Sequence, residues 1–138
     1  MSEFERAEDD AAADAAILRH LLAFNERFAG QANSRSLQLL LRDSAGVVEG
    51  GLSGRTRYGW LFVENFFIPE HRRGTGLGTR LLAAAEAEAA ARGCIGAYLD
   101  TNSFQAPGFY EKQGYSRFGA LEDYPAPGMA KYYYRKRF

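Results

Sequence analysis

The sequence has 138 residues, 46% of them hydrophobic and 25% charged, which is the size and composition of one globular domain. Seventeen basic residues balance seventeen acidic ones, so the net charge gives no reason to expect a nucleic-acid partner. No segment approaches the roughly 20 consecutive apolar residues of a membrane span, and the acidic N-terminus is unlike a signal peptide. With Cys94 as the single cysteine and only two histidines, neither a disulfide framework nor a metal site is expected. We therefore expect one cytoplasmic domain over residues 1–138 with no membrane partner.

The first half of the sequence predicts a helix followed by three strands. Helical spacing of apolar residues indicates a helix over Ala13–Phe28, with Asp10 or Asp14 at its start and Gly30 after its end. The turn residues Asp43–Gly46 connect the first two strands into a hairpin. The predicted strands are, in order, Ser36–Arg42, Val47–Leu52 and Tyr58–Ile68, the last ended by Pro69.

The second half predicts two helices and three strands. An alanine- and leucine-rich segment runs to Arg92, and Gly93 suits the position after a helix end. Pro107–Gln113 has proline at its first position and Gly114 just past its end, which is typical of a short helix. The predicted strands are Ile95–Asp100, Tyr115–Ala120 and Met129–Lys136. This order of elements predicts a mixed α/β domain with one parallel crossover in its middle.

A basic and glycine-rich run, called the glycine loop below, separates the third strand from the alanine-rich helix. Glycines at alternate positions allow the backbone to approach a ligand closely and to turn its N–H groups inward. The following helix leaves its first N–H groups unpaired and carries about half a positive charge at that end. Together these features favour a phosphate or pyrophosphate ligand. The glycine loop reads Arg72-Arg73-Gly74-Thr75-Gly76-Leu77-Gly78-Thr79.

Three classes of phosphate ligand compete for this loop. A P-loop ends in Gly-Lys-Ser/Thr, whereas Gly78 is followed by Thr79 and Arg80, so that class is excluded. A dinucleotide site needs G-x-G-x-x-G, and the third position here is Thr79 or Leu81, although Asp100 stands where a ribose-binding acid belongs. The third ligand is coenzyme A. A structural glycine turn that binds nothing is the remaining alternative.

Two segments resemble the GCN5-related N-acetyltransferase (GNAT) family. Arg73–Gly78 matches the family's Q/R-x-x-G-x-G/A signature, whose loop binds the coenzyme A pyrophosphate. Phe109–Tyr115 is similar to the family's F-Y-x-K-x-G-F/Y segment, about 30 residues further on. Order, spacing and the intervening strand all agree, and the resemblance extends from Val47 to about Tyr115.

The resemblance implies a fold, a reaction and a co-substrate. The fold is a mixed, mostly antiparallel central sheet with helices on both faces and a splayed parallel pair of strands at the cofactor site. The reaction moves an acetyl group from acetyl-coenzyme A to a primary amine of a small molecule or protein, by direct attack in a ternary complex. The residues implied to bind the coenzyme are Phe66, Phe67, Ile68, Arg73, Gly74, Thr75, Gly76, Leu77, Gly78, Thr79 and Asn102.

Tyr110 and Glu64 are the candidate catalytic residues. Family members commonly use a tyrosine at the position of Tyr110 as the acid for the departing thiolate, and a phenol with a pKa near 10 is protonated at neutral pH. The alternative is an aromatic side chain that only fills the core. Strand alternation places Glu64 on the face of Phe66 and Ile68, where it is a candidate base for the amine. A structural carboxylate, or a chain of waters that carries the proton, are the alternatives.

A second class of function stays open at this point. A catalytically silent module of the same fold would bind or sense coenzyme A, or dimerise. The aromatic terminal strands are the candidate surface for a homodimer, and Glu122, Asp123 and Tyr124 could attract a cationic acceptor. Cys94 is expected to be a small buried side chain, because no histidine stands near it in the sequence.

Overall fold

A computed structural model describes residues 2–138, which form two units, residues 2–32 and 33–138. The first unit contains helix α1, Ala11–Ala29. Its start is capped by Asp10, whose carboxylate accepts a 2.9 Å hydrogen bond from the N–H of Ala13, and its end is followed by Gly30 with φ 73°. The predicted helix and both of its ends are therefore confirmed.

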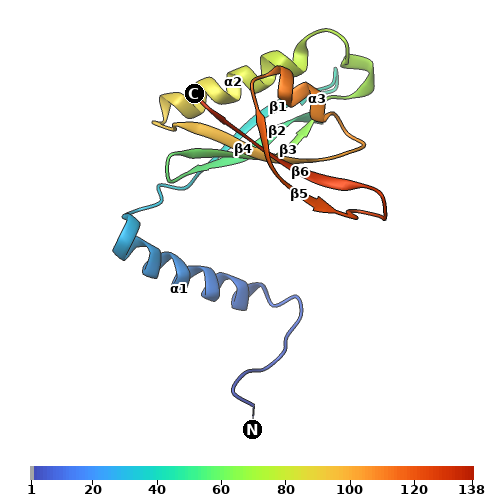
Figure 1. The fold of residues 1–138 in the computed structure, drawn as a ribbon. Helices are drawn as coiled ribbons and strands as arrows, with labels where there is room; N and C mark the ends of the chain where they lie inside the picture. Colours follow the sequence, from blue (N-terminus) through green and yellow to red (C-terminus); the bar gives the residue numbers. More distant parts are fainter. Residues whose placement is uncertain (1) are drawn as a thin grey trace. The chain divides into compact units, whose positions relative to one another are not determined.

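The second unit is one sheet of six strands in the order β1-β2-β3-β4-β6-β5 (Figure 1). Neighbouring strands are antiparallel except for the parallel pair β3–β4, which confirms the predicted crossover. The strands are β1 Arg35–Arg42, β2 Val48–Arg57, β3 Trp60–Phe67, β4 Gly96–Asn102, β5 Ser116–Glu122 and β6 Ala130–Arg137. The helices are α2 Leu77–Ala91, α3 Pro107–Lys112 and a 3-10 turn, Glu70–Arg72.

Strand β2 is longer than the sequence predicts, and β3 begins two residues later. Arg57 pairs with Trp60, so Tyr58 and Gly59 form a two-residue turn in which both have positive φ, 51° and 76°. Such turns match the twist of a hairpin. The prediction was wrong here because Leu52 is followed by Ser53 and Gly54, and glycine disfavours a strand by propensity.

Helices α2 and α3 pack against the same face of the sheet (Figure 1). Helix α2 contributes Leu82 and Ala85, and the sheet contributes Leu61, Leu99 and Tyr134, all at most 1% exposed. Cys94 belongs to this core, as expected of a small buried side chain. No helix within residues 2–138 is long and apolar enough to cross a membrane.

A β-bulge and an early end to strand pairing shape the centre of the sheet. Gly54 pairs with Val63 and Ser53 with Asn65, so Glu64 is an extra residue on β3. The β3–β4 ladder runs only from Trp60–Gly96 to Val63–Leu99. Beyond Val63, the edge of β3 that faces β4 has no strand partner.

Candidate active site

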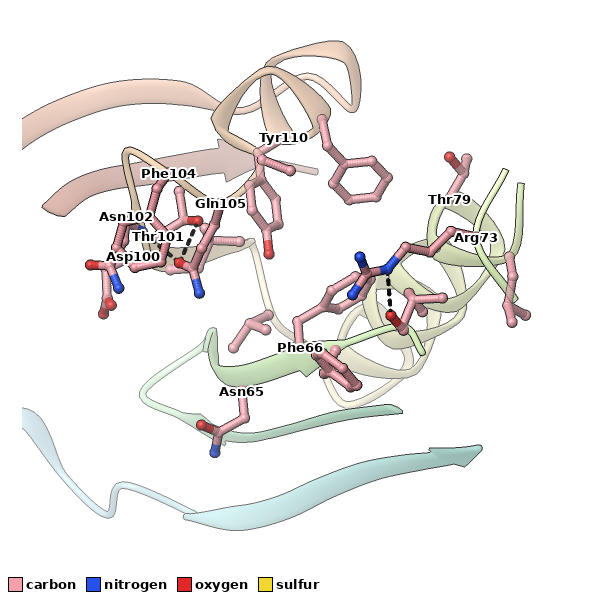
Figure 2. Close-up of a pocket in the computed structure, with 18 of the residues that line it drawn as sticks. Asn65, Phe66, Arg73, Thr79, Asp100, Thr101, Asn102, Phe104, Gln105 and Tyr110 are labelled. Atoms are coloured by element: carbon pink, nitrogen blue, oxygen red, sulfur yellow. Dashed lines mark hydrogen bonds between the residues drawn. The ribbon is translucent and has the colours of Figure 1, made fainter. Parts of the chain in front are cut away.

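A cavity of about 990 Å³ lies where β3 and β4 separate (Figure 2). Its walls are the second half of β3, the glycine loop, the start of α2, the end of β4 and helix α3. All of the sequence-predicted site residues except Thr75 line it. The Thr75 hydroxyl instead donates to the carbonyl of Arg72, and the Thr75 carbonyl accepts from Arg80, so Thr75 holds the loop in shape.

The glycine loop has the geometry of an anion site. Gly74 and Gly76 both have φ 76°, a conformation that disfavours residues with a side chain. Gly76 precedes α2 and no side chain caps that helix, so its first-turn N–H groups have no partner within the helix. Gly78 differs in role, because a Cβ there would lie 3.5 Å from the ring of Phe109 and 3.7 Å from Ile68. Position 78 therefore has room for a methyl group but for little more between α2 and α3.

The two arginines of the loop have different surroundings. Arg72 forms an ion pair with Glu49 at 3.2 Å. Arg73 donates through Nε to the carbonyl of Ile68 at 2.8 Å (Figure 2), and its guanidinium lies 5.6 Å from the ring centre of Phe67. The terminal nitrogens of Arg73 make no hydrogen bond with any residue among 2–138. Arg73 is therefore the arginine whose charge is available to a ligand.

One residue of β3 presents its backbone to the cavity. The carbonyl of Phe67 is directed toward β2, since a Cβ on Gly50 would lie 2.6 Å from that oxygen. Backbone groups alternate along a strand, so the N–H and C=O of Phe66 face the open edge toward β4. The carbonyl of Ile68 accepts a hydrogen bond from Arg73. The ring of Phe66 meanwhile packs on Phe109 at 5.8 Å, so backbone and side chain have separate roles.

Tyr110 is buried, at 7% exposure, and its hydroxyl points from α3 into the cavity (Figure 2). Its ring packs edge-on against Phe66 at 6.2 Å and Tyr115 at 6.1 Å. Burial, and secondly the negative charge of Asp100, raise the pKa of Tyr110 to about 12. The phenol is therefore protonated at any physiological pH, and its hydroxyl lies at the cavity.

Glu64 is exposed and lines the cavity. The prediction that strand alternation puts it on the same face as Phe66 was wrong. The bulge at Glu64 interrupts the alternation of β3. Phe66 consequently packs against the core on the same side as Leu61 and Val63, so Glu64 does not share a face with Phe66 by parity. Its place in the cavity follows from the bulge.

Several cavity residues were not predicted as part of a coenzyme A site. Gln105 accepts hydrogen bonds from the N–H of Asn102 at 2.6 Å and the hydroxyl of Thr101 at 3.1 Å, which fixes the turn after β4. Asp100 lies 3.9 Å from the ammonium of Lys131. The position of Asp100 at the carboxyl end of a parallel strand is the signal that could have found it, because ligands of open α/β sheets bind there.

Comparison with known proteins assigns the family. Residues 3–115 match the model of the acetyltransferase (GNAT) family. The chain belongs to this family. It is 44% identical over 112 residues to Acetyltransferase Atu2258 of Agrobacterium fabrum, covering 81% of this chain and 82% of that one. It is also 44% identical over 88 residues to the blasticidin-S acetyltransferase of Streptomyces morookaense, covering 63% and 64%.

Solved structures agree with this assignment. A crystal structure titled as that of an acetyltransferase from Agrobacterium tumefaciens matches with a TM-score of 0.91 at 39% identity, and the match covers 100% of each chain. The predicted mixed fold, with its mostly antiparallel sheet and one parallel pair, is thereby confirmed. The helices α2 and α3 lie on one face of the sheet, however, whereas helices on both faces were expected. As a GNAT member the protein is an N-acetyltransferase that uses acetyl-coenzyme A as co-substrate. Among residues 2–138 no three His, Cys, Asp or Glu side chains cluster as metal ligands would.

Proposed function

We propose that this GNAT enzyme acetylates a primary amine of a small molecule by direct attack in a ternary complex. The supporting observation is the open backbone edge at Phe66 beside the Tyr110 hydroxyl, in one cavity that also includes the glycine loop. The name of the blasticidin-S acetyltransferase favours a small-molecule acceptor over a protein.

The chain offers two sets of groups for acetyl-coenzyme A, which supplies an acetyl group activated as a thioester. The free N–H groups at the start of α2, with Gly74, Gly76 and Arg73, suit the charge of a pyrophosphate. The backbone of Phe66 offers a donor and an acceptor on the open edge of β3, which can pair with the amide groups of the coenzyme arm as a neighbouring strand would. Asn102 lines the facing wall.

Tyr110 acts on the departing sulfur. A pKa of about 12 exceeds that of a thiol, near 8.5. Full proton transfer from the phenol to the sulfur is therefore uphill, while hydrogen-bond donation to a developing thiolate is favourable. Tyr110 is the donor in this proposal.

The proposed function is tested first by calorimetric titration with acetyl-coenzyme A and, in parallel, with NADH. We expect binding of acetyl-coenzyme A alone. Arg73→Gln should weaken it about tenfold, the effect of one lost charge-assisted hydrogen bond, with kcat little changed. Arg137→Gln, on β6 and outside the cavity lining, is the matched control. Preference for NADH, or no binding of either, would mean that the glycine loop is not a coenzyme A site.

Glu64 is proposed as the base that removes the proton of the attacking ammonium. Glu64→Gln should lower kcat/KM at neutral pH by about a hundredfold, the usual contribution of a general base, and should change the shape of the pH–rate profile. Glu70→Gln, an exposed carboxylate outside the cavity lining, is the control. If the profile of Glu64→Gln has the same shape as wild type, water must carry the proton instead.

A further inference from the structure

The cavity has a second group of residues on the sheet face opposite to the helices. Along β4, Leu99 and Thr101 are buried on the face that packs against α2 and α3, whereas Asp100 and Asn102 are half-buried and alternate with them. Asp100 and Asn102 nevertheless line the cavity, as Tyr110 does from the helix side. The cavity therefore passes between the separated strands from one face of the sheet to the other. In Figure 2, Arg73 and Thr79 lie at one end and Asp100 and Asn102 at the other.

Strand β6 and the loop before it complete this second end. Lys131 pairs with Asn102 across the β4–β6 ladder, and paired residues project from the same face of a sheet. The Lys131 ammonium lies 3.9 Å from a carboxylate oxygen of Asp100 and 4.2 Å from the ring centre of Tyr124. Both Lys131 and Tyr124 line the cavity. We call Asp100, Asn102, Tyr124 and Lys131 the β4–β6 mouth.

The chemistry of this mouth is that of a cation site. A carboxylate and an aromatic ring face stabilise a positive nitrogen, and here they already hold the ammonium of Lys131. The Asp100–Lys131 distance is close to the limit for an ion pair, and both side chains keep access to water, at 32% and 21% exposure. An ion pair of this kind is weak, so a ligand that makes the same contacts with Asp100 and Tyr124 can replace Lys131.

An unsatisfied acceptor lies beside this carboxylate. Asn102 Oδ1 is buried and has no hydrogen-bond partner, the one such side-chain atom among residues 2–138. Leaving a polar atom buried and unpaired is unfavourable. A ligand that brings several N–H donors would satisfy Asn102 Oδ1 and Asp100 together.

We infer that the β4–β6 mouth selects acceptors that carry a second, cationic nitrogen, bound by Asp100, Asn102 and Tyr124 in place of Lys131. This inference rests on the proposed function, because the nitrogen that attacks the thioester must be neutral. The charge balanced by Asp100 consequently belongs to another nitrogen of the same acceptor. Lys131 acts as an internal competitor, whose positive charge lowers the affinity for any acceptor cation.

The competitor role makes two substitutions act in opposite directions. Asp100→Asn removes the negative charge and should weaken binding of a dicationic amine about tenfold, as expected for the loss of a hydrogen bond to a charged group. Lys131→Gln removes the competing ammonium and should strengthen binding severalfold. Glu70→Gln, an exposed carboxylate in the 3-10 turn outside the cavity lining, should leave binding unchanged.

The test uses agmatine, which combines a primary amine with a guanidinium, and n-pentylamine, which has the amine alone. Each is titrated into the full chain saturated with coenzyme A, and binding is followed by the NMR shifts of the Asn102 and Lys131 amides. We expect agmatine to bind more tightly than n-pentylamine, and only agmatine to respond to Asp100→Asn and Lys131→Gln in opposite directions. If the enzyme acetylates agmatine, the KM for agmatine should be higher in Asp100→Asn and lower in Lys131→Gln than in the wild type.

Three results would overturn the inference. These are no binding of agmatine, an equal response of both amines to Asp100→Asn, or weaker agmatine binding in Lys131→Gln. Failure of the proposed function is distinguishable, because it would appear earlier as absent binding of acetyl-coenzyme A to the wild-type protein.

Discussion

Tyr110→Phe should lower kcat about a hundredfold and leave the Kd for acetyl-coenzyme A within about twofold. The hydroxyl is the only group removed, and it points into the cavity from a ring that is otherwise held by Phe66 and Tyr115. Phenylalanine keeps those ring contacts, so binding of the coenzyme should persist while the donor to the departing sulfur is lost. Steady-state kinetics and calorimetry on the same preparation measure the two effects.

The control for this substitution is Tyr98→Phe. Tyr98 also lies in an aromatic cluster, stacked on Phe62 at 4.8 Å, but it does not line the cavity. Its kcat should equal that of the wild type. Because the pKa of Tyr110 is about 12, any loss of wild-type activity between pH 8 and 10 must come from another group. Unchanged turnover in Tyr110→Phe would remove Tyr110 from the mechanism.

Gly54→Ala should destabilise the fold by about 3 kcal/mol or more, an effect at the upper end for overpacking. A Cβ at Gly54 would lie 2.2 Å from the carbonyl oxygen of Phe62, on the neighbouring strand. The obstacle is backbone, so it cannot rotate away. Gly54 also pairs with Val63, immediately before the bulge at Glu64, so the substitution disturbs the strand at the point where the cavity opens. Denaturant unfolding measures the loss.

Gly108→Ala is the matched control for Gly54→Ala. No heavy atom lies within 4 Å of a Cβ built at Gly108, and its φ is not positive. Its free energy of unfolding should equal that of the wild type or exceed it by up to about 1 kcal/mol, because Gly108 lies in α3 and alanine favours a helix. Equal stability of Gly54→Ala and Gly108→Ala would show that β2 can move away from β3 without cost.

The parts of the site that follow from local sequence were predictable. The glycine loop and the start of α2 depend on glycines and on an uncapped helix, both visible in the sequence, and the structure places them at the cavity. Tyr110 was predicted as the candidate acid for the departing thiolate, with a core aromatic as the alternative. In the structure Tyr110 does point into the cavity, and Phe109 lies against Phe66. A short helix gives adjacent residues different directions, so this part needed no long-range information.

The parts that depend on pairing between strands were not predictable. No residue type marks the bulge at Glu64, because the bulge is a property of the register between β2 and β3. Lys131 reaches Asp100 only because β6, and not β5, is the neighbour of β4 in the sheet. Residues 31 positions apart give no periodic signal, so the composition of the β4–β6 mouth required the fold.

The surroundings of Gly78 explain why the last position of the family's signature is glycine or alanine. The signature R-x-x-G-x-G/A tolerates alanine at its last position and not at Gly76. A methyl group at position 78 would make ordinary van der Waals contact with Phe109 at 3.5 Å, whereas any longer side chain would push α3 and Tyr110 away from the loop. At Gly76 the positive φ disfavours alanine, although the nearest atom is an arginine side chain at 3.4 Å. One glycine of the signature is thus a conformational requirement, and the other is a limit on volume.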